Sequence, residues 1–397
     1  SRFEPLQIVD GLSSYSPAAK LVELKCDESQ KSVTAQLFGL AETKAKYRKA
    51  LGCSLEIGDT SSLDSVNFIS NSTTNNKNNT FIAIDSVIQK SIEQLITYDN
   101  QQGFNTRALL VVKNGQIIAE SYSDNITPQT PLLGWSMAKS LTAIILGRLE
   151  YLGKVSMSQN QLFQEWQSSD RKQLTLTNLL QMSSGLAFDE TYAPGSDATH
   201  MLFTARSASE VALASELKQQ PGSHFSYSSG TTNLLSRFIH QQLGNSTQAD
   251  LDFIHQEIFK PLDMAHTIFE VDSSGVLIGS SYLYASGRDW AKLGLLMLNK
   301  GWYGQQQLLS KAWVNAAQTP NISRNDKRYG FQFWLNAGEN ELRWPELPDD
   351  AYAMLGNRKQ SVMIIPSENT ILIRLGWTKG EYPMEQHYQK ILKQLKK

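Results

Sequence analysis

The sequence predicts an α/β fold in which helices flank an antiparallel sheet and an all-helical subdomain interrupts it. Strand patterns lie at both ends of residues 81–397, around residues 107–121 and 361–375, whereas residues 160–300 are mostly helical by their period. Because strands from the two ends would share one sheet, the helical stretch becomes a subdomain beside it. We expect a ligand cleft between the two parts, where pockets often form.

The chain divides into three regions. Residues 1–68 are predicted to be a helical segment, with a helix over about residues 32–51 that ends at Gly52. Residues 69–80 carry almost no apolar side chains and are predicted to be a linker. Residues 81–397 form the main domain.

The two cysteines, Cys26 and Cys53, both lie in the N-terminal region. Their pairing would favour an oxidising compartment, although two unpaired buried thiols are the alternative. The start at Ser1 rather than Met suggests that a segment upstream was removed, either by secretory processing or in preparing the protein. A periplasmic or secreted location is therefore expected.

The main domain contains several elements with clear signals. Asn114-Gly115 between two apolar runs predicts a hairpin turn. The elements predicted in order are a helix over 85–98, hairpin strands over 107–112 and 117–121, a helix over 136–152, an antiparallel pair over 361–365 and 371–375, and a C-terminal helix with Met384, Tyr388, Ile391, Leu392 and Leu395 on one face.

Composition excludes several classes of partner. The chain of 397 residues has 37 basic and 38 acidic residues, with no basic run to follow a phosphate backbone. Nucleic acid is therefore not an expected partner. No apolar run approaches the length that spans a bilayer, so we expect no membrane span. The expected partner is a small molecule, and the oligomeric state is left open.

Ser136-Met137-Ala138-Lys139 places a hydroxyl and an amine one helical turn apart, where an apolar run begins. Residues at i and i+3 of a helix share one face, so Lys139 lies within reach of Ser136 and can activate it as a nucleophile. The same spacing occurs in two further pairs, which we interpret as solvated surface pairs: Ser169/Lys172 and Ser215/Lys218.

A second motif, Tyr227-Ser228-Ser229, follows a Pro-Gly turn and leads into a predicted helix. Together with residues 179–186, 286–294 and 356–376, in this order, the two motifs resemble the serine β-lactamase and penicillin-recognising superfamily. The similar branch contains class C β-lactamases, esterases and 6-aminohexanoate-oligomer hydrolases. The resemblance implies a β-lactamase/transpeptidase-like fold and a serine hydrolase that cleaves an ester or amide through an acyl-enzyme on Ser136.

The resemblance implies Ser136, Lys139 and Tyr227 as catalytic residues, with no metal or cofactor. At a helix start, unpaired N–H groups would favour negative charge on Ser136 and on an attacked carbonyl. A neutral Lys139 needs a lowered pKa, which burial supplies. Tyr227 would act as phenolate or as proton relay, and the sequence leaves open which of Lys139 and Tyr227 is the base.

Substrate-binding candidates follow from the same resemblance. Ser229 stands where class C enzymes carry Asn, which weakens a β-lactamase interpretation. The Lys-Thr-Gly motif is absent near residues 353–360, which leaves the second oxyanion donor unnamed. The resemblance places its N–H between residues 356 and 361. Arg358, next to Asn357, would bind an acidic group, whereas a cleft-edge loop with Asp189 and Tyr192 would suit an amine-bearing substrate.

The sequence is also compatible with other functions. A non-catalytic penicillin-binding-like sensor would keep the fold, and a D-amino-acid peptidase or β-lactamase would use the same nucleophile on another substrate. Gly134-Trp135-Ser136-Met137-Ala138 approximates the nucleophile elbow of α/β-hydrolases, but its approach is not strand-like. The six histidines are scattered, which argues against a metal hydrolase.

Overall fold

The computed structural model describes residues 17–69, 81–338 and 341–396. Its main sheet is antiparallel and six-stranded, with the order β12-β13-β14-β15-β5-β6. The strands are β12 (Trp334–Leu335), β13 (Tyr352–Gly356), β14 (Gln360–Ile365), β15 (Thr370–Gly376), β5 (Thr106–Lys113) and β6 (Gln116–Tyr122). The predicted sheet, built from both ends of the main domain, is confirmed.

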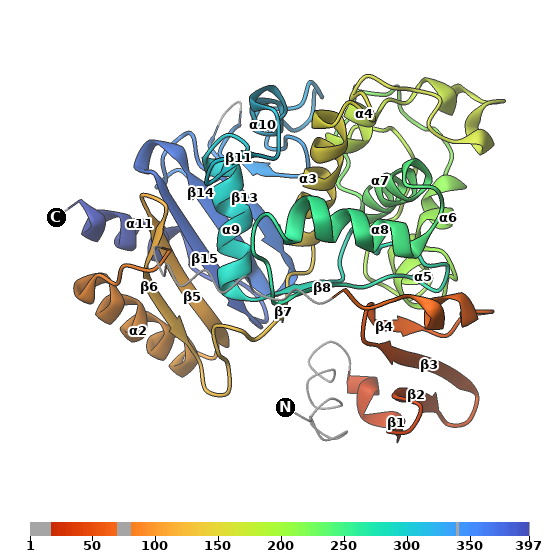
Figure 1. The fold of residues 1–397 in the computed structure, drawn as a ribbon, viewed down its shortest axis with the longest axis horizontal. Helices are drawn as coiled ribbons and strands as arrows, with labels where there is room; N and C mark the ends of the chain where they lie inside the picture. The colour runs from red at the N-terminus through yellow and green to blue at the C-terminus, as the bar shows by residue number, and fades with distance from the viewer. Residues whose placement is uncertain (1–16, 70–80, 339–340, 397) are drawn as a thin grey trace.

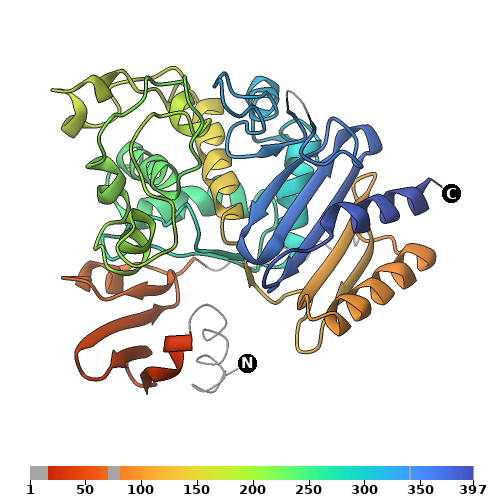
Figure 2. The ribbon, with the colours of Figure 1, turned by 180° about the vertical axis from the view of Figure 1, so that it is seen from behind.

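Helices cover both faces of this sheet. On β15, Ile371 and Ile373 belong to the core that α9 (Gly287–Leu298) covers, while Leu372 between them belongs to the core under α2 (Ser86–Gln101) and α11 (Met384–Leu395). This follows from the two-residue period of a strand. Figures 1 and 2, seen from opposite sides, show α9 on one face and α2 with α11 on the other.

The strongest local signals are also confirmed. The turn between β5 and β6 has Asn114 at φ 51° and Gly115 at φ 81°, the left-handed pair that a tight hairpin needs. The predicted pair near the C-terminus is β14 and β15. Asp85 caps α2 by accepting hydrogen bonds from the N–H groups of Val87 and Ile88.

The helical part lies beside the sheet and is built of short helices joined by loops (Figure 1). Its helices are α3 (Met137–Tyr151), α4 (Leu176–Leu180), α5 (Asp197–Phe203), α6 (Ala208–Leu213), α7 (Ser229–Gln242) and α8 (Thr247–Ile254). The predicted extent of the helical subdomain to residue 300 is too long, because α9 packs on β14, β15 and β5 of the main sheet.

A small sheet of β7 (Leu132–Leu133), β9 (Leu283–Ala285) and β8 (Thr267–Phe269) lies between the two parts. The remaining elements after α9 are β10 (Trp302–Tyr303), β11 (Gln306–Gln307) and α10 (Lys311–Ala317).

The predicted helix over residues 32–51 is wrong. The N-terminal region forms a separate four-stranded antiparallel sheet of β1 (Val22–Asp27), β2 (Ser32–Leu37), β3 (Ala41–Arg48) and β4 (Gly52–Leu55). Phe38 at φ 51° and Gly39 at φ 68° turn the chain between β2 and β3, and a helix cannot pass through two left-handed residues.

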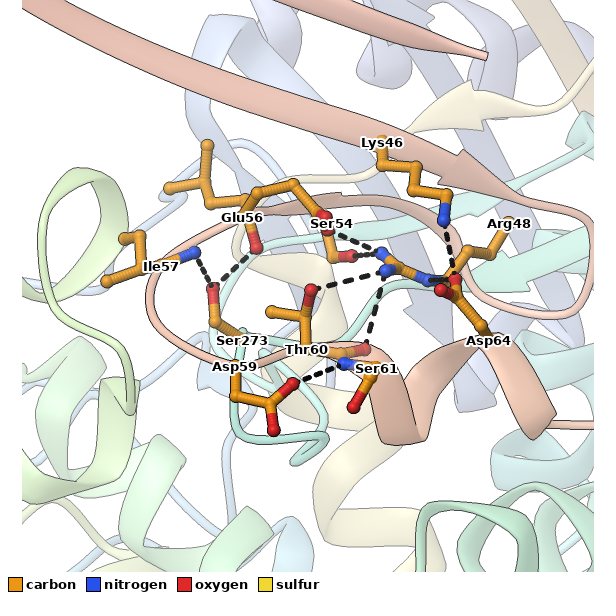
Figure 3. A network of polar contacts seen from close by, with 11 residues as sticks. Lys46, Arg48, Ser54, Glu56, Ile57, Asp59, Thr60, Ser61, Asp64 and Ser273 are labelled. Atoms are coloured by element: carbon orange, nitrogen blue, oxygen red, sulfur yellow. Dashed lines mark hydrogen bonds and ion pairs between the residues drawn. The ribbon is translucent and has the colours of Figure 1, made fainter. Parts of the chain in front are cut away.

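Arg48 ties this N-terminal sheet to the segment that follows it (Figure 3). Its guanidinium is buried and donates to Asp64, Ser54 and Glu56, each at 2.8 Å. The sheet itself also contacts the main domain, because Ser273 Oγ donates to the carbonyl of Leu55, at the end of β4, at 2.5 Å.

The question left open for the two cysteines is answered against a disulfide, since both are free, and both are exposed rather than buried. Cys26 lies on β1 and Cys53 on β4, with two strands between them. Three strand spacings amount to about 14 Å, whereas bridged cysteines need Cα atoms within about 7 Å. The cysteines therefore give no support to an oxidising compartment.

The predicted linker at 69–80 lies outside the described residues except for Ile69. None of the helices in the described part of the chain combines the length and apolar character needed to cross a membrane.

Candidate active site

The chain turns sharply just before α3. Trp135 is left-handed at φ 49°, which is uncommon for a large side chain, and Ser136 is the N-cap residue of the helix. Gly134 N donates to the carbonyl of Leu283 at 2.8 Å, which fixes the approach to the small sheet. The turn therefore places the Ser136 side chain at the mouth of α3, where the N–H groups of Met137, Ala138 and Lys139 donate to the carbonyls of Gly134, Trp135 and Ser136.

Lys139 lies one turn deeper and is 0 % exposed. Its Nζ contacts Ser136 Oγ at 3.3 Å, Ser229 Oγ at 3.0 Å and the carbonyl oxygen of Ser280 at 3.0 Å. By contrast, the lysines of the two similar sequence pairs, Lys172 and Lys218, are exposed. Burial therefore distinguishes this Ser-Lys pair from the other two.

Glu190 binds the first residue of α7. Its Oε2 accepts from Ser229 N and its Oε1 accepts from Ser229 Oγ, both at 2.6 Å. Ser228 caps the same helix by accepting from Thr231 N at 3.0 Å. A carboxylate at a helix N-terminus is favoured by the helix dipole.

These contacts fix the direction of the hydrogen bonds around Lys139. The hydroxyl of Ser229 donates to Glu190, so its oxygen accepts from Lys139, and the Ser280 carbonyl can only accept. A neutral amine has two N–H groups, and both are used by these acceptors. The nitrogen lone pair is then left for Ser136.

The burial of Lys139 shifts it toward this neutral form. Burial lowers its pKa to about 8, and the nearby Glu190 carboxylate opposes that shift. At a pKa of about 8, roughly one amine in ten is unprotonated at pH 7, far more than for a lysine with its usual pKa.

Tyr227 comes from the loop before α7. Its ring stacks on Trp334 with centroids 5.3 Å apart and meets Tyr329 edge to face at 5.9 Å. Lys139 Nζ lies 4.9 Å from the Tyr227 ring centroid. Burial raises the pKa of the phenol above its usual range, and an interaction with the Ser136 side chain opposes this shift. The structure thus brings Ser136, Lys139 and Tyr227 together.

The two residues predicted at the cleft edge, Asp189 and Tyr192, lie farther from the site than Ser229 does. Asp189 is exposed, and its Oδ1 accepts from the N–H and hydroxyl of Thr191 at 2.9 and 2.7 Å. Tyr192 is 58 % exposed and interacts with Ser229. Neither Asp189 nor Tyr192 lines the pocket that contains Ser136.

The segment after β13 approaches Ser136 from the sheet. Gly356 lies so close to Gly134 that a Cβ on it would come within 2.1 Å of the Gly134 carbonyl oxygen. Asn357 borders the same pocket as Ser136, and its Oδ1 accepts from Arg358 N at 2.8 Å. Arg358 itself is buried, with its guanidinium 5.3 Å from the ring centroid of Trp377. Of the predicted pair, Asn357 borders the pocket and Arg358 does not.

Arg374 on β15 holds the segment that follows β13 through a hydrogen bond to its backbone. Its side chain is fully buried and donates to the carbonyl of Lys359 at 2.9 Å and to Thr106 and Thr378 at 2.7 and 2.6 Å. Gln360 adds a reciprocal pair of hydrogen bonds with the backbone of Gly376.

A pocket of about 560 Å³ opens over these groups. Its lining residues come from α3, the Tyr227 loop, the segment before β13, the β13–β14 turn and the start of α11: Ser136, Tyr227, Trp334, Arg343, Trp344, Leu355, Gly356, Asn357, Lys359, Gln360, Glu381, Tyr382, Met384, Glu385 and Gln386. Within residues 17–69, 81–338 and 341–396, no group of three or more His, Cys, Asp or Glu side chains could hold a metal ion.

The sequence model of the family described as Beta-lactamase matches residues 85–394. The chain belongs to this family. A 6-aminohexanoate-dimer hydrolase of Paenarthrobacter ureafaciens is 22 % identical over 285 residues, which cover 68 % of this chain and 72 % of that protein. The structure of a family VIII carboxylesterase aligns with a TM-score of 0.62 at 12 % identity, covering 79 % of this chain and 98 % of the other. A penicillin-binding protein from Bacillus halodurans aligns with a TM-score of 0.58 at 17 % identity, covering 76 % and 99 %. At these identities the structural matches show a common fold.

Sequence reasoning missed two charged residues of the site, Glu190 and Arg343. For Glu190 a signal existed, because Asp189-Glu190-Thr191 is a pattern in which the aspartate binds the threonine two residues on. That leaves Glu190 as the carboxylate free to turn inward. No local pattern indicates Arg343, which reaches the pocket from the segment between β12 and β13.

Proposed function

We propose that this Beta-lactamase-family hydrolase is a serine hydrolase that cleaves an ester or amide through an acyl-enzyme on Ser136. The observation that carries the proposal is the set of three contacts around Lys139 Nζ, which commits both N–H groups of a neutral amine to Ser229 and Ser280. The remaining lone pair faces Ser136 Oγ at 3.3 Å. This is the arrangement of a nucleophile with its own general base.

In the first step, the Lys139 amine takes the proton of Ser136 as Oγ attacks the substrate carbonyl carbon. The resulting oxyanion would be stabilised by the N–H of Ser136 at the start of α3 and by an N–H of the segment after Gly356. We propose Asn357 for that second donor, because it borders the pocket immediately after the close approach of Gly356 to Gly134.

Tyr227 would act as the proton relay rather than as the base. Its raised pKa keeps the phenol protonated near neutral pH, whereas the pKa of Lys139 is lowered to about 8. Tyr227 gives its hydroxyl proton to the leaving oxygen or nitrogen as the carbonyl re-forms, and recovers a proton from the Lys139 ammonium. Water then attacks the acyl-enzyme by the reverse sequence and frees Ser136.

Both ester and amide cleavage are consistent with the relatives. The relative from Paenarthrobacter ureafaciens is named for a 6-aminohexanoate dimer, and a structural neighbour is a carboxylesterase. We give the ester precedence, because Ser229 replaces the carboxamide expected for a β-lactamase and its hydroxyl is already committed to Glu190.

The test is a panel of p-nitrophenyl esters, a chromogenic cephalosporin and a D-Ala-D-Ala peptide. We expect steady ester turnover, with kcat/KM lowered at least about 10³-fold in Ser136→Ala and by a comparable factor in Lys139→Ala and Tyr227→Phe. Ser169→Ala and Lys172→Ala are matched controls, since they remove a pair with the same spacing whose lysine is exposed.

Other outcomes are informative. Equal rates in the wild type and Ser136→Ala would end the proposal. A single stoichiometric acylation without turnover would instead indicate a sensor, and preference for the peptide or the cephalosporin would indicate a peptidase or β-lactamase.

A further inference from the structure

Arg343 is held beside the reacting groups by two indole rings. Its guanidinium carbon lies 4.0 Å from the ring centroid of Trp334 and 5.5 Å from that of Trp344. Trp334 also stacks on Tyr227. Aromatic faces attract a guanidinium and fix its plane. Arg343 is therefore a rigid cation in the pocket that contains Ser136.

This cation has no anionic partner in the described part of the chain. Arg343 forms no ion pair or hydrogen bond with residues 17–69, 81–338 or 341–396, and its Nε is buried without an acceptor. The carboxylate of Asp326 lies near but accepts from Nε and Nη2 of Arg328, at 3.0 and 2.9 Å. Burial, followed by repulsion from Arg328, lowers the pKa of Arg343 to about 10. Only Nε is buried without an acceptor, which is costly for a charged group, whereas the side chain as a whole is half-buried, so a ligand can reach its other N–H groups.

The other charges of the pocket already have partners. Lys359 pairs with Glu381 at 2.9 Å, and Glu385 Oε1 accepts from Glu346 N at 2.5 Å. Among the described residues that line the pocket, Arg343 is thus the one cation whose charge is left for a ligand.

Resting on the proposed function, we propose that Arg343 binds a carboxylate of the substrate, so that the enzyme prefers an ester or amide that carries a negative group. The planar fork of a guanidinium matches the two oxygens of a carboxylate. A neutral substrate that fills the pocket excludes water from it, and the N–H groups of Arg343 are then left without acceptors. The preference therefore arises from both a new attraction and an avoided penalty.

The test compares ester pairs that differ only in this charge. One pair carries it on the acyl side, mono-p-nitrophenyl adipate and its methyl ester. The other carries it on the leaving group, meta-carboxyphenyl hexanoate and its methyl ester. We expect the wild type to favour the anionic member of at least one pair. Arg343→Gln should lower the ratio of the two kcat/KM values at least about tenfold, the size expected for a charged hydrogen bond. Arg343→Lys keeps the charge but loses the planar fork, so its ratio of kcat/KM values should lie between those of the wild type and Arg343→Gln.

Lys359→Gln is the matched control, because it removes a cation from the same pocket whose charge is already paired with Glu381. Its effect on the ratio should be less than about threefold. The inference is overturned if the neutral member is preferred in both pairs, or if Arg343→Gln leaves the ratios unchanged.

A binding measurement separates this inference from the proposed chemistry. Calorimetric titration of Ser136→Ala with the four esters should give tighter binding of the anionic member, and this difference should vanish in Ser136→Ala/Arg343→Gln. Anion-selective binding combined with Ser136-independent turnover would sink the proposed function alone. Ser136-dependent turnover without anion selectivity would sink the role of Arg343 alone.

Discussion

The Glu190 carboxylate holds Ser229 at two points, its backbone N–H and its hydroxyl, each at 2.6 Å. Because that hydroxyl also accepts from Lys139 Nζ, the carboxylate orients the amine without contacting it. In the proposed mechanism Glu190 is therefore a positioning residue with two opposing effects. It would direct the lone pair of Lys139 toward Ser136, while its negative charge raises the pKa of that amine.

Glu190→Gln is expected to move the pH dependence of the reaction to lower pH. Burial lowers the pKa of Lys139 to about 8, and Glu190 is the charge that opposes this shift, so its removal lets the pKa fall further. The acid limb of kcat/KM, which reports the free amine, should then lie below its wild-type position near pH 8. The measurement is the pH–rate profile on a p-nitrophenyl ester.

Asp189→Asn provides the control for this profile. Asp189 is the adjacent carboxylate, but it is exposed and its side chain binds Thr191. Its removal should leave the acid limb in place. An unchanged or upward-shifted limb in Glu190→Gln would show that the Lys139 amine is not the group that titrates.

Local signals explain which parts of the fold were predictable. Asn114-Gly115 fixes its hairpin through backbone conformations that few residues adopt, and the motif from Ser136 to Lys139 needs only helical geometry to bring its ends together. The approach of Tyr227 depends on the whole fold, and its placement was expected only from the family resemblance.

The errors also have physical reasons. Most side chains of β3 are exposed, so residues 41–48 lack the apolar alternation that marks a half-buried strand, and their Ala, Glu and Lys content favours a helix. Arg343 reaches the pocket only because Trp334 and Trp344 pack against it. A single charged residue in a connecting segment gives no such indication in sequence.

Gly356→Ala is expected to lower kcat more than it lowers stability. A Cβ at this position would meet the Gly134 carbonyl oxygen at 2.1 Å, so either the β13–β14 turn or the backbone before Ser136 must move. A displacement of about 1 Å in a catalytic site can cost about 10²-fold in rate. We expect a loss of about 10²-fold in kcat, measured beside thermal unfolding.

Gly294→Ala is the matched comparison for Gly356→Ala. Its Cβ would crowd Ile371 and Val362 at 3.1 Å in the core under α9, away from the pocket. It should show no selective loss of kcat, whatever the balance of this crowding and the gained helix propensity does to the melting temperature. If both variants lose activity only in proportion to stability, the segment after Gly356 does not help to form the site.

Arg374→Lys is expected to destabilise the fold and raise KM. The guanidinium donates to the Lys359 carbonyl, Thr106 and Thr378 while fully buried, and an ammonium cannot span these acceptors. A loss of about 3 kcal/mol in unfolding free energy is expected from the unsatisfied buried groups. Denaturant unfolding measures it.

Arg288→Lys serves as the comparison for Arg374→Lys. Arg288 also forms a forked contact, with Glu120, but it is only partly buried and does not line the pocket. Its replacement should cost less stability and leave KM unchanged. Equal effects of the two variants would show that Arg374 does not support the segment that borders the pocket.

Glu270→Gln is expected to remove part of the pH dependence of stability. Glu270 accepts from Cys53 N at 2.7 Å, where the N-terminal sheet meets the main domain, and burial raises its pKa from 4.5 to about 7. Between these values the folded state binds more protons than the unfolded state, so this group's contribution to stability falls as pH rises from about 4.5 to 7. The shift of the pKa corresponds to at most about 3 kcal/mol.

Because Gln keeps an acceptor for Cys53 N but cannot ionise, the Glu270→Gln variant should gain stability relative to the wild type as pH rises. The two stability curves should converge near pH 4.5. Denaturant unfolding at several pH values measures the difference, with the exposed Glu216→Gln as a control that should follow the wild type. A difference in unfolding free energy between wild type and Glu270→Gln that stays constant from pH 4.5 to about 7 would show that Glu270 does not titrate at the contact between the N-terminal sheet and the main domain.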